Sequence, residues 1–278
     1  MRKIKIVADT SCDLFKLTSV EFSSAPMKIL TDDQEFVDDT ELDVDAMVNY
    51  LYQYKGKSKS SCPNTNDWLQ AFGDADDVFC VTITSGLSGS YNSACAAKQI
   101  YESENEGKRV FVFDSLSAGP EITLILEKLE ECVVCGMSCE NIFDEVTAYM
   151  KKTGLIFMLK SLKNFANNGR VSPVVAKLVG IAGICIVGKA SEQGTLEPRH
   201  KCRGELRSLE ALVKDLEAEG FRSGKVCIGH CQNEAAANRL KELILAKFKD
   251  AKIEIHTFRG LCSFYAEKGG VLVGFEKM

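Results

Sequence analysis

Long apolar runs are the first feature that this 278-residue sequence lacks. Its longest uncharged apolar segment covers only residues 178–188, whereas a membrane-spanning helix needs roughly 20 such residues. The N-terminal segment Met1–Asp9 carries basic residues, but its apolar stretch is too short for the core of a signal peptide. We therefore expect a cytoplasmic protein without stable membrane insertion.

Blocks of like charge are also lacking. The sequence has 34 Lys and Arg residues against 39 Asp and Glu, a formal net charge of −5, and no long run of either sign. Because nucleic-acid-binding proteins usually carry a basic patch or stripe, no nucleic-acid partner is expected. There is no low-complexity tract, and 45% hydrophobic with 26% charged residues is typical of a globular protein. Disordered and fibrous classes are thereby excluded.

The 12 cysteines are too few for a disulfide scaffold, which has roughly 8–10% cysteine. Without an export signal they are expected to be reduced thiols. Cys132, Cys135 and Cys139 resemble half of a metal site, but Gly136 is expected to end one helix and Ser138 to begin the next. The sequence also offers no fourth ligand nearby. We predict neither a metal nor a cofactor, and expect these thiols to act as small buried side chains.

Three apolar, strand-like segments each end in a cluster of hydroxyl residues. They are Ile4–Ala8, Val78–Ile83 and Val110–Phe113, and a helical segment over Tyr91–Glu102 separates the last two. This spacing is typical of a βαβ unit, which pairs its strands in parallel. Near-continuous apolar strands indicate a sheet with helices on both faces.

The pattern changes after about residue 155. Earlier helices are predicted to begin at Pro120 and Ser138. Apolar runs separated by polar turns follow, predicting strands at Leu155–Leu159, Ile184–Val187, Val226–Gly229, Ile253–Thr257 and Val271–Phe275, and helices at Leu206–Ala218 and Glu234–Lys247. We therefore predict two α/β domains. Residues 1–155 form the first, with a mainly parallel sheet, and residues 156–278 form a smaller mixed α/β domain.

The loop Thr84–Ser90 is the most informative segment. Parallel sheets bind ligands beyond the carboxyl ends of their strands, and this loop joins such an end to the start of a helix, whose free N–H groups attract anions. The loop has no Lys or Arg, which a polyphosphate would normally need, so a monoanion such as a carboxylate is favoured. The alternative is that Ser88 or Ser90 merely caps the helix. A second hydroxyl cluster, Ser60–Asn64, either adds a donor or forms an N-cap loop.

A serine hydrolase is the main alternative from another functional class. Gly86–Ser90 resembles a nucleophile elbow, but its second glycine comes one residue too early for G-x-S-x-G. Ser88 would then need one of the three histidines: His200 in a basic turn, or His230 and His256 at or near the ends of predicted strands.

Two further patterns carry charge. Gly183–Lys189 matches a phosphate-binding loop in its glycines and lysine, but Ala190 replaces the Ser or Thr that holds magnesium, and strand formers lie between the glycines. We therefore exclude a phosphate loop. The turn Arg199–Arg203 and the segment Asn167–Arg170 are either solvated or face a partner protein.

Several motifs, in order along nearly the whole chain, resemble those of the DegV family of bacterial fatty-acid-binding proteins. The resemblance is carried by Ile6–Leu14 (IVADTSCDL against V-x-D-S-T-x-D-L), Ser60–Pro63 (SSCP against T-S-Q-P), Thr84–Ala94 (TSGLSGSYNSA against S-S-x-L-S-G-T-Y-x-x-A), Asp114–Ser115, Asn168–Ser172 (NGRVS against G-G-R-I-S) and Lys201–Gly204 (KCRG, against an arginine motif).

This resemblance implies a long-chain fatty acid with its tail in an apolar tunnel and its carboxylate on the hydroxyl groups of Ser60 and Ser88. It implies a partner, the ATP-dependent catalytic subunit of a fatty acid kinase, which makes an acyl phosphate while the binding protein itself catalyses nothing. The resemblance implies that Arg203 takes part in docking to that partner, and we expect Arg170 to take part as well.

The sequence departs from the family pattern at Ser60, where threonine is usual, and at Cys62, where glutamine is usual. In place of the C-terminal H-x-G-P-G it has Tyr265–Gly269. The histidine is thereby lost, and we expect the Tyr265 hydroxyl to donate instead. The predicted ligand-binding residues are Ser60, Ser61, Thr84, Ser85, Ser88, Gly89, Ser90 and Tyr265.

Overall fold

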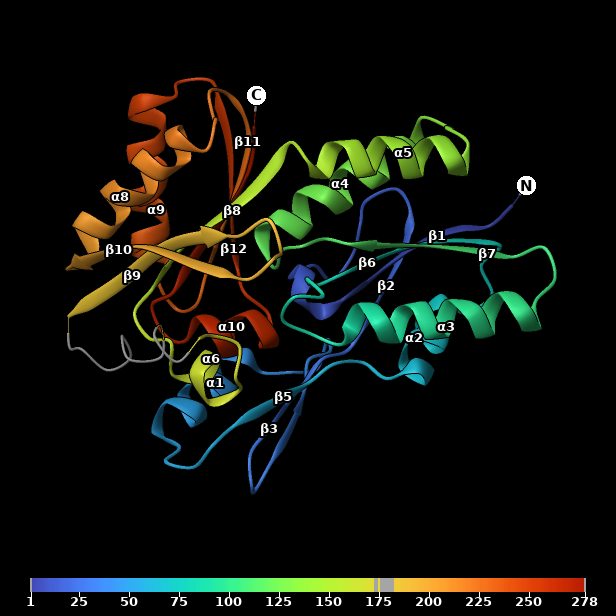
Figure 1. Cartoon of the computed structure of the whole chain (residues 1–278), viewed down its shortest axis with the longest axis horizontal. Helices are drawn as coiled ribbons and strands as arrows, with labels where there is room; N and C mark the ends of the chain where they lie inside the picture. Colours follow the sequence, from blue (N-terminus) through green and yellow to red (C-terminus); the bar gives the residue numbers. More distant parts are fainter. Residues whose placement is uncertain (1, 173–174, 176–182, 278) are drawn as a thin grey trace.

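The computed structural model describes residues 2–172, 175 and 183–277. Part of the apolar segment 178–188 lies outside these residues. Three sheets organise the described part of the chain: a parallel sheet between two pairs of helices, a larger mixed sheet, and a small antiparallel sheet that extends away from both (Figure 1). Within the described residues, no helix combines the length and the apolar character that crossing a bilayer requires.

The first sheet is parallel throughout, as the βαβ spacing predicts. Its strand order is β2-β1-β6-β7. The strands are β1 (Ile4–Asp9), β2 (Glu21–Ala25), β6 (Asp77–Thr82) and β7 (Arg109–Asp114), and a 3-10 turn, η1 (Thr10–Cys12), follows β1. The sequence prediction missed β2, whose exposed and half-buried polar residues hide its strand character.

Helices cover both faces of this sheet because alternate residues of its strands point to opposite sides. Ile6 and Ala8 pack with α4 (Pro120–Val134) and α5 (Cys139–Met150), whereas Val7 packs with α2 (Thr65–Phe72) and α3 (Ser90–Glu104). Figure 1 shows α4 and α5 above the sheet and α2 and α3 below it. Pro120 begins α4 and Ser138 caps α5, as predicted.

The second sheet has six strands in the order β10-β9-β8-β13-β11-β12, and only the β11–β12 pair is parallel. The strands are β8 (Thr153–Leu159), β9 (Ile184–Ala190), β10 (Leu196–Arg203), β11 (Gly224–His230), β12 (Ala251–Thr257) and β13 (Val271–Glu276). Helices α8 (Glu205–Ala218) and α9 (Glu234–Lys247) pack on one face. The mixed sheet therefore has more strands than the parallel one.

The prediction of a basic turn at Arg199–Arg203 is wrong, because these residues belong to β10. β10 is an edge strand with Pro198 at an irregularity in its pairing to β9. Edge strands tolerate proline and charged residues, and this tolerance removed the apolar pattern on which the prediction depended. Gly183–Lys189, by contrast, enters strand β9, as its strand-forming residues indicate.

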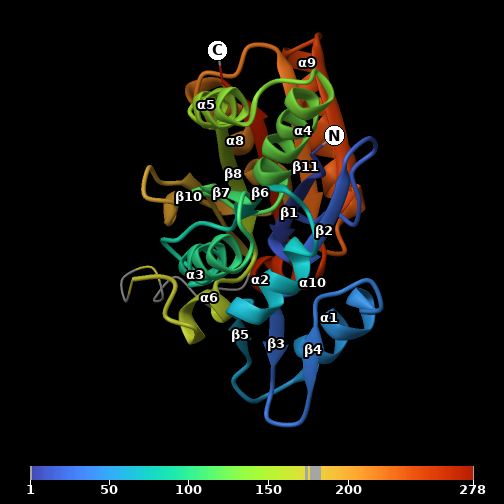
Figure 2. The same ribbon diagram turned by 90° about the vertical axis from the view of Figure 1, so that its right-hand side faces the viewer.

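The third sheet is small and antiparallel. It consists of β3 (Lys28–Leu30), β4 (Glu35–Val37) and β5 (Lys59–Ser61), with β3 in the centre. Helix α1 (Val44–Gln53) lies beside it (Figure 2). Met47 of α1 and Ile29 of β3 share a core with Phe264 of α10 (Gly260–Ala266). This sheet therefore reaches the C-terminal part of the chain.

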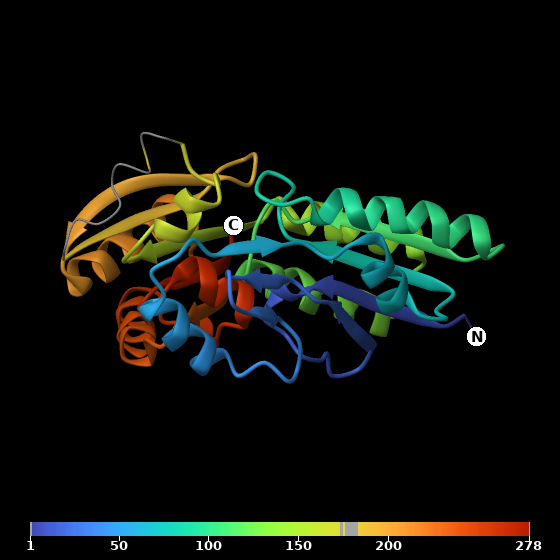
Figure 3. The same cartoon turned by 90° about the horizontal axis from the view of Figure 1, so that it is seen from below.

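The boundary after residue 155 stays a prediction, and contacts cross it in several places. Helix α4 contacts β11 and β13 of the mixed sheet as well as β1 of the parallel sheet. The hairpin of β9 and β10 ends beside the loop that precedes α3 (Figure 3). Short α6 (Lys163–Asn167) packs against α10. The space where the three sheets approach one another is where the site lies.

Candidate functional site

The carboxyl ends of β1, β6 and β7 meet as the sequence predicts. A carboxyl oxygen of buried Asp9 accepts hydrogen bonds from the backbone N–H of Ile83 (2.9 Å) and the hydroxyl of Ser90 (2.5 Å). The backbone N–H of Thr84 donates to the carbonyl of Ser117 (2.9 Å). Asp9 thus joins the end of its strand to the start of α3 and fixes the loop between Ile83 and Ser90.

A cavity of about 300 Å³ opens beside this loop, at the lower end of the volumes common for small-molecule sites. Its walls come from the small and the mixed sheets, from the loops that follow β6 and β7 of the parallel sheet, and from α6 and α10, and they are mainly apolar. The lining residues are Met27, Ser60, Ser61, Cys62, Ile83, Thr84, Leu87, Ser88, Gly89, Ser117, Ala118, Leu155, Phe157, Leu159, Phe165, Arg170, Ala190, Gly194, Thr195, Leu196, Leu261, Cys262, Tyr265, Ala266 and Leu272.

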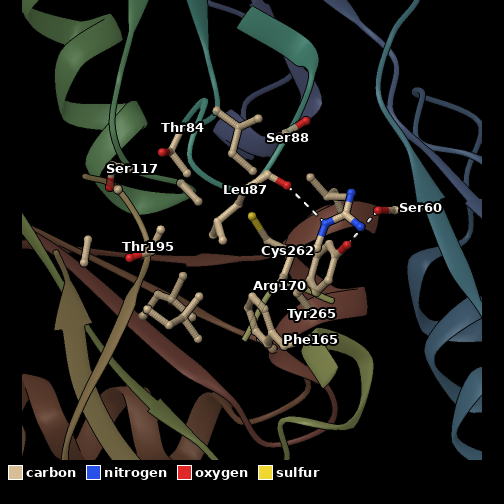
Figure 4. A pocket seen from close by; sticks show the side chains of 18 of the residues that line it. Ser60, Thr84, Leu87, Ser88, Ser117, Phe165, Arg170, Thr195, Cys262 and Tyr265 are labelled. Atoms are coloured by element: carbon tan, nitrogen blue, oxygen red, sulfur yellow. Dashed lines mark hydrogen bonds between the residues drawn. The ribbon is translucent and has the colours of Figure 1, made fainter. Parts of the chain in front are cut away.

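One side of the cavity is polar and carries a positive charge. The hydroxyl oxygens of Ser60 on β5 and Tyr265 on α10 lie 2.7 Å apart. The guanidinium of Arg170 lies beside them, and Ser88 lies on the same side (Figure 4). Arg170 Nε donates to the carbonyl of Leu87 (3.1 Å), so the arginine is tied to the Ser88 loop. We call Ser60, Ser88, Arg170 and Tyr265 the polar mouth.

The hydroxyls of the polar mouth retain hydrogen atoms for a ligand. Ser88 Oγ accepts from the backbone N–H of Ser90 (3.2 Å), which leaves its own hydrogen available. Either Ser60 or Tyr265 donates to the other, so one of the pair keeps a free hydrogen. Burial raises the pKa of Tyr265, which keeps its hydroxyl protonated as a donor. The mouth combines these donors with one cation, and this chemistry suits a carboxylate.

Two neighbours hold the mouth in position. The side chain of Asn168 accepts from the backbone N–H of Ser60 (3.3 Å) and donates to the carbonyl of Ser58 (3.2 Å), which ties β5 to the segment that carries Arg170. The ring of Phe165 lies 4.7 Å from the ring of Tyr265, centroid to centroid. These contacts hold Ser60 and Tyr265 in position, although the two residues come from distant parts of the sequence.

Comparison with known proteins identifies the chain. The family model described as "Uncharacterised protein, DegV family" matches residues 3–277. The chain belongs to the DegV family. A DegV domain-containing protein of Streptococcus pneumoniae strain R6 is 43% identical over 276 residues, which cover 98% of each chain.

Solved structures of DegV proteins share the fold. A DegV family protein from Eubacterium eligens loaded with heptadecanoic acid has a TM-score of 0.96 and 42% identity, covering 99% of this chain and 100% of that one. The Fatty Acid Kinase (Fak) B3 protein of Streptococcus pneumoniae loaded with linoleic acid has a TM-score of 0.96 and 43% identity, covering 99% of both chains. The mixed α/β class expected from the sequence is confirmed.

The DegV chain brings together most of the residues that the sequence singled out. Ser60, Ser61, Thr84, Ser88, Gly89 and Tyr265 all line the cavity. Two members of the Ser88 loop do not line it. Ser85 is exposed, and the hydroxyl of Ser90 points to Asp9. Since neighbouring residues at a helix start face different directions, a loop motif alone does not tell which hydroxyl faces the ligand.

The two arginines that the sequence predicted at a docking surface lie in different places. Arg170 is half-buried and lines the cavity, whereas Arg203 is exposed at the end of β10. The sequence pattern treated both as charged surface residues. Only the contact of Arg170 with Leu87 reveals that it belongs to the mouth.

The hydrolase alternative requires a histidine beside Ser88, and none of the three histidines is among the cavity residues. His200 Nε2 lies 2.8 Å from Asp215 Oδ1 on the outer part of the mixed sheet. His230 Nδ1 accepts from the backbone N–H of Asn233 (3.3 Å). His256 Nε2 lies 3.4 Å from Glu254 Oε2 on the same strand. Ser88 therefore has no histidine base.

The cysteine pattern is divided between two helices, as the caps predict. Cys132 is in α4, Cys135 follows its end, and Cys139 begins α5 after Gly136 in a left-handed conformation. Cys132 and Cys139 are buried, whereas Cys135 is exposed, which corrects its predicted burial. Within the described part of the chain, no cluster of three or more His, Cys, Asp or Glu side chains is placed to hold a metal ion.

Sequence reasoning missed several cavity residues. Phe165, Thr195 and Cys262 lie in segments that had no predicted role. The continuous apolar run of β8 (Leu155–Leu159) predicted burial but not which of its side chains meet a cavity. The only signal for Thr195 is the glycine before it, at a hairpin tip where a close approach of two segments requires a residue without Cβ.

Proposed function

We propose that this protein binds a long-chain fatty acid, with its acyl tail in the cavity and its carboxylate at the polar mouth. The observation that carries the proposal is an apolar cavity closed on one side by the hydroxyls of Ser60, Ser88 and Tyr265 and by the charge of Arg170. The ligands of the Eubacterium eligens and pneumococcal relatives, a saturated and an unsaturated fatty acid, support it.

The energetics favour such a ligand. Burial of an alkyl chain contributes about 0.8 kcal/mol per methylene, so a sixteen-carbon tail contributes roughly 10 kcal/mol before entropic costs. An unpaired carboxylate would cost several kcal/mol on leaving water. The mouth offsets this cost with a guanidinium and hydroxyl donors. Burial of the tail therefore supplies affinity, and the polar mouth determines that the carboxylate end of the fatty acid lies against it.

We further propose that the bound carboxylate is presented to the catalytic subunit of a fatty acid kinase, which forms the acyl phosphate while this protein catalyses nothing itself. The name of the pneumococcal neighbour, a Fatty Acid Kinase B3 protein, supports this role. Exposed Arg203 is the proposed docking residue. Because such a partner uses ATP, the pair would act in the cytoplasm.

The decisive experiment is mass spectrometry of lipid extracted from the purified full-length chain. A fatty acid in near-stoichiometric amount is expected. If the extract holds no fatty acid and the lipid-free protein binds neither octadecanoic nor octadecenoic acid in calorimetry, the proposal is wrong.

A substitution tests the mouth itself. Ser88→Ala is expected to weaken fatty-acid binding by about 1–3 kcal/mol, the scale of a hydrogen bond to a charged group. Ser85→Ala is the matched control, because Ser85 is on the same loop but is exposed and outside the cavity lining. Equal affinities of the two variants and the wild type would remove Ser88 from the site.

The partner role needs a separate assay. With kinase subunit and ATP, Arg203→Ala is expected to slow acyl phosphate formation while leaving fatty-acid affinity unchanged. Normal phosphorylation rates across a range of concentrations of this protein would exclude Arg203 from docking.

A further inference from the structure

The cavity has a second polar region, away from the mouth. Thr84, Ser117 and Thr195 line it from the loops after β6 and β7 and from the β9–β10 hairpin. Figure 4 shows these three side chains on the opposite side of the cavity from Arg170 and Tyr265, with Leu87 between the two groups. We call Thr84, Ser117 and Thr195 the hydroxyl corner.

Tight packing of the three loops builds the hydroxyl corner. The backbone N–H of Thr84 donates to the carbonyl of Ser117 (2.9 Å). The hairpin approaches so closely that a Cβ at Gly194 would lie 1.9 Å from Thr84 Oγ1, and Gly194 has a φ of +68° that favours glycine. This approach places the next residue, Thr195, beside the same loop, where its methyl carbon would be 3.2 Å from a Cβ at Gly86.

The hydroxyl of Thr84 has a hydrogen to spare. The side chain is only 1% exposed. Its oxygen accepts from the backbone N–H of Gly86 (3.0 Å). No acceptor for its hydrogen is found among the described residues, although a hydroxyl can donate as well as accept. Because a buried donor without an acceptor costs free energy, a ligand atom that accepts this hydrogen would be favoured.

The hydroxyl of Thr195 also has a hydrogen to spare. Ser191 Oγ accepts from the backbone N–H groups of Thr195 (3.1 Å) and Gln193 (3.3 Å). Either hydroxyl of the Ser191–Thr195 pair, 2.9 Å apart, could donate. Because two N–H groups already engage the lone pairs of Ser191, we assign Ser191 as the donor and Thr195 Oγ1 as the acceptor. The hydrogen of Thr195 is therefore left for the cavity.

Ser117 supplies the complementary function. It is 2% exposed, and its hydroxyl donates to Glu121 Oε2 (2.5 Å). Glu121 Oε1 accepts a second hydrogen bond, from Thr153 (2.7 Å). Ser117 Oγ therefore keeps lone pairs that can accept a hydrogen from a ligand. Two donors and one acceptor in one corner match an alcohol oxygen, which accepts two hydrogen bonds and donates one.

We propose that the hydroxyl corner is a second subsite, which binds an alcohol group on the acyl chain, so that the favoured ligand is a hydroxylated long-chain fatty acid. This inference rests on the proposed function. Only when the polar mouth holds the carboxylate does the hydroxyl corner meet a defined carbon of the acyl chain. A purely hydrocarbon tail would leave the free hydrogens of Thr84 and Thr195 without acceptors.

The test is a calorimetric competition series on the lipid-free full-length protein. The ligands are octadecanoic acid and isomers of hydroxyoctadecanoic acid with the hydroxyl at successive carbons. One isomer, or two neighbouring ones, is expected to bind at least as tightly as octadecanoic acid, while the other isomers bind more weakly because they bury an unpaired hydroxyl.

Variants identify the corner as the cause. Thr195→Val and Thr84→Val remove the donors and retain the side-chain shape. Each is expected to reduce the affinity ratio of the favoured isomer to octadecanoic acid by about 3- to 10-fold, the range of a neutral hydrogen bond. Thr147→Val on α5 removes a hydroxyl outside the cavity lining and is expected to leave the ratio unchanged. Thermal melts check that each variant is folded.

The outcomes separate the two proposals. If octadecanoic acid binds but every isomer is weaker, with the same ratios in the wild type and in both valine variants, the hydroxyl corner is not a subsite and fatty-acid binding stands. If neither octadecanoic acid nor any isomer binds, the proposed function itself fails. A positional optimum that only the corner variants abolish supports the subsite.

Discussion

The hydroxyls of Ser60 and Tyr265 lie 2.7 Å apart although 205 residues separate them in the sequence. One belongs to an edge strand of the small antiparallel sheet and the other to α10. Their contact closes one side of the polar mouth. Tyr265 stands where the family motif would have a histidine, and that its hydroxyl takes over the role of this histidine stays a prediction.

Removal of the Tyr265 hydroxyl tests that contact. Tyr265→Phe keeps the ring packed on Phe165 but loses a donor, so fatty-acid affinity is expected to fall by about 1–2 kcal/mol with little change in stability. Isothermal titration calorimetry measures the effect. Tyr52→Phe, at a tyrosine that is 75% exposed, is the control. Equal affinities of both variants would contradict a role for the hydroxyl.

Arg170 is expected to act by geometry as well as by charge. Lysine keeps the charge but cannot reproduce the planar guanidinium fork, which donates to Leu87 and has further N–H groups for the proposed carboxylate. We expect affinity for a fatty acid to fall in the order wild type, Arg170→Lys, Arg170→Met. A fatty alcohol of the same length, which has no carboxylate, should bind the three proteins with nearly equal affinity. A parallel loss for acid and alcohol would show that Arg170 only shapes the cavity.

Asp9 is expected to stabilise the loop through acceptors alone. Its carboxyl group accepts from the backbone N–H groups of Ile83 and Ser11 and from the hydroxyls of Ser11 and Ser90. Asp9→Asn would turn an amide N–H₂ group toward these donors, so the free energy of unfolding should fall by about 2–4 kcal/mol.

Chemical denaturation measures this change. Asp250→Asn, at an exposed aspartate, serves as the matched control. A loss below about 0.5 kcal/mol, the size of an ordinary surface substitution, would mean that the Asp9 network does not hold the loop.

The stability of the protein is expected to depend on pH through Asp13. Burial raises the pKa of its carboxyl group from 3.8 to about 8. The folded state therefore holds a proton that the unfolded state releases, and the free energy of unfolding should fall as the pH rises from about 4 to about 8. Burial also raises the pKa of Asp9, Asp38, Glu121 and Glu267, with the same sign.

Urea unfolding at a series of pH values between 5 and 8 tests this. One such group contributes a slope of up to about 1.4 kcal/mol per pH unit. Asp13→Asn, which is neutral in both states, should reduce the slope by that amount over the window. Identical slopes for the variant and the wild type would show that Asp13 titrates normally.

Much of the site was predictable because its parts are local. Apolar strands followed by hydroxyl residues predicted where the parallel sheet ends, and the motif around Ser88 predicted the loop that lines the cavity. Pro120 at the first helical position and the N-cap Ser138 predicted two helix starts. Each of these signals depends on a few neighbouring residues, so their spacing along the chain is enough to interpret it.

Other features depended on contacts that no local pattern encodes. β10 looked like a basic turn because an edge strand has one free side and tolerates Pro198. Arg170 looked like a surface residue until its contact with Leu87 placed it at the mouth. The hydroxyl of Ser90 turned to Asp9, away from the cavity, because β1 and α3 meet there.

The sequence by itself determined the class of fold, the family and the hydroxyl-rich loop around Ser88, since these follow from strand spacing and from short motifs. Only the tertiary structure decided that a cavity exists, that Tyr265 reaches Ser60, and that three hydroxyls gather at the far side. The physical reason is that a cavity is the space left between packed elements. Its walls come from segments hundreds of residues apart, and their spacing depends on how all three sheets pack together.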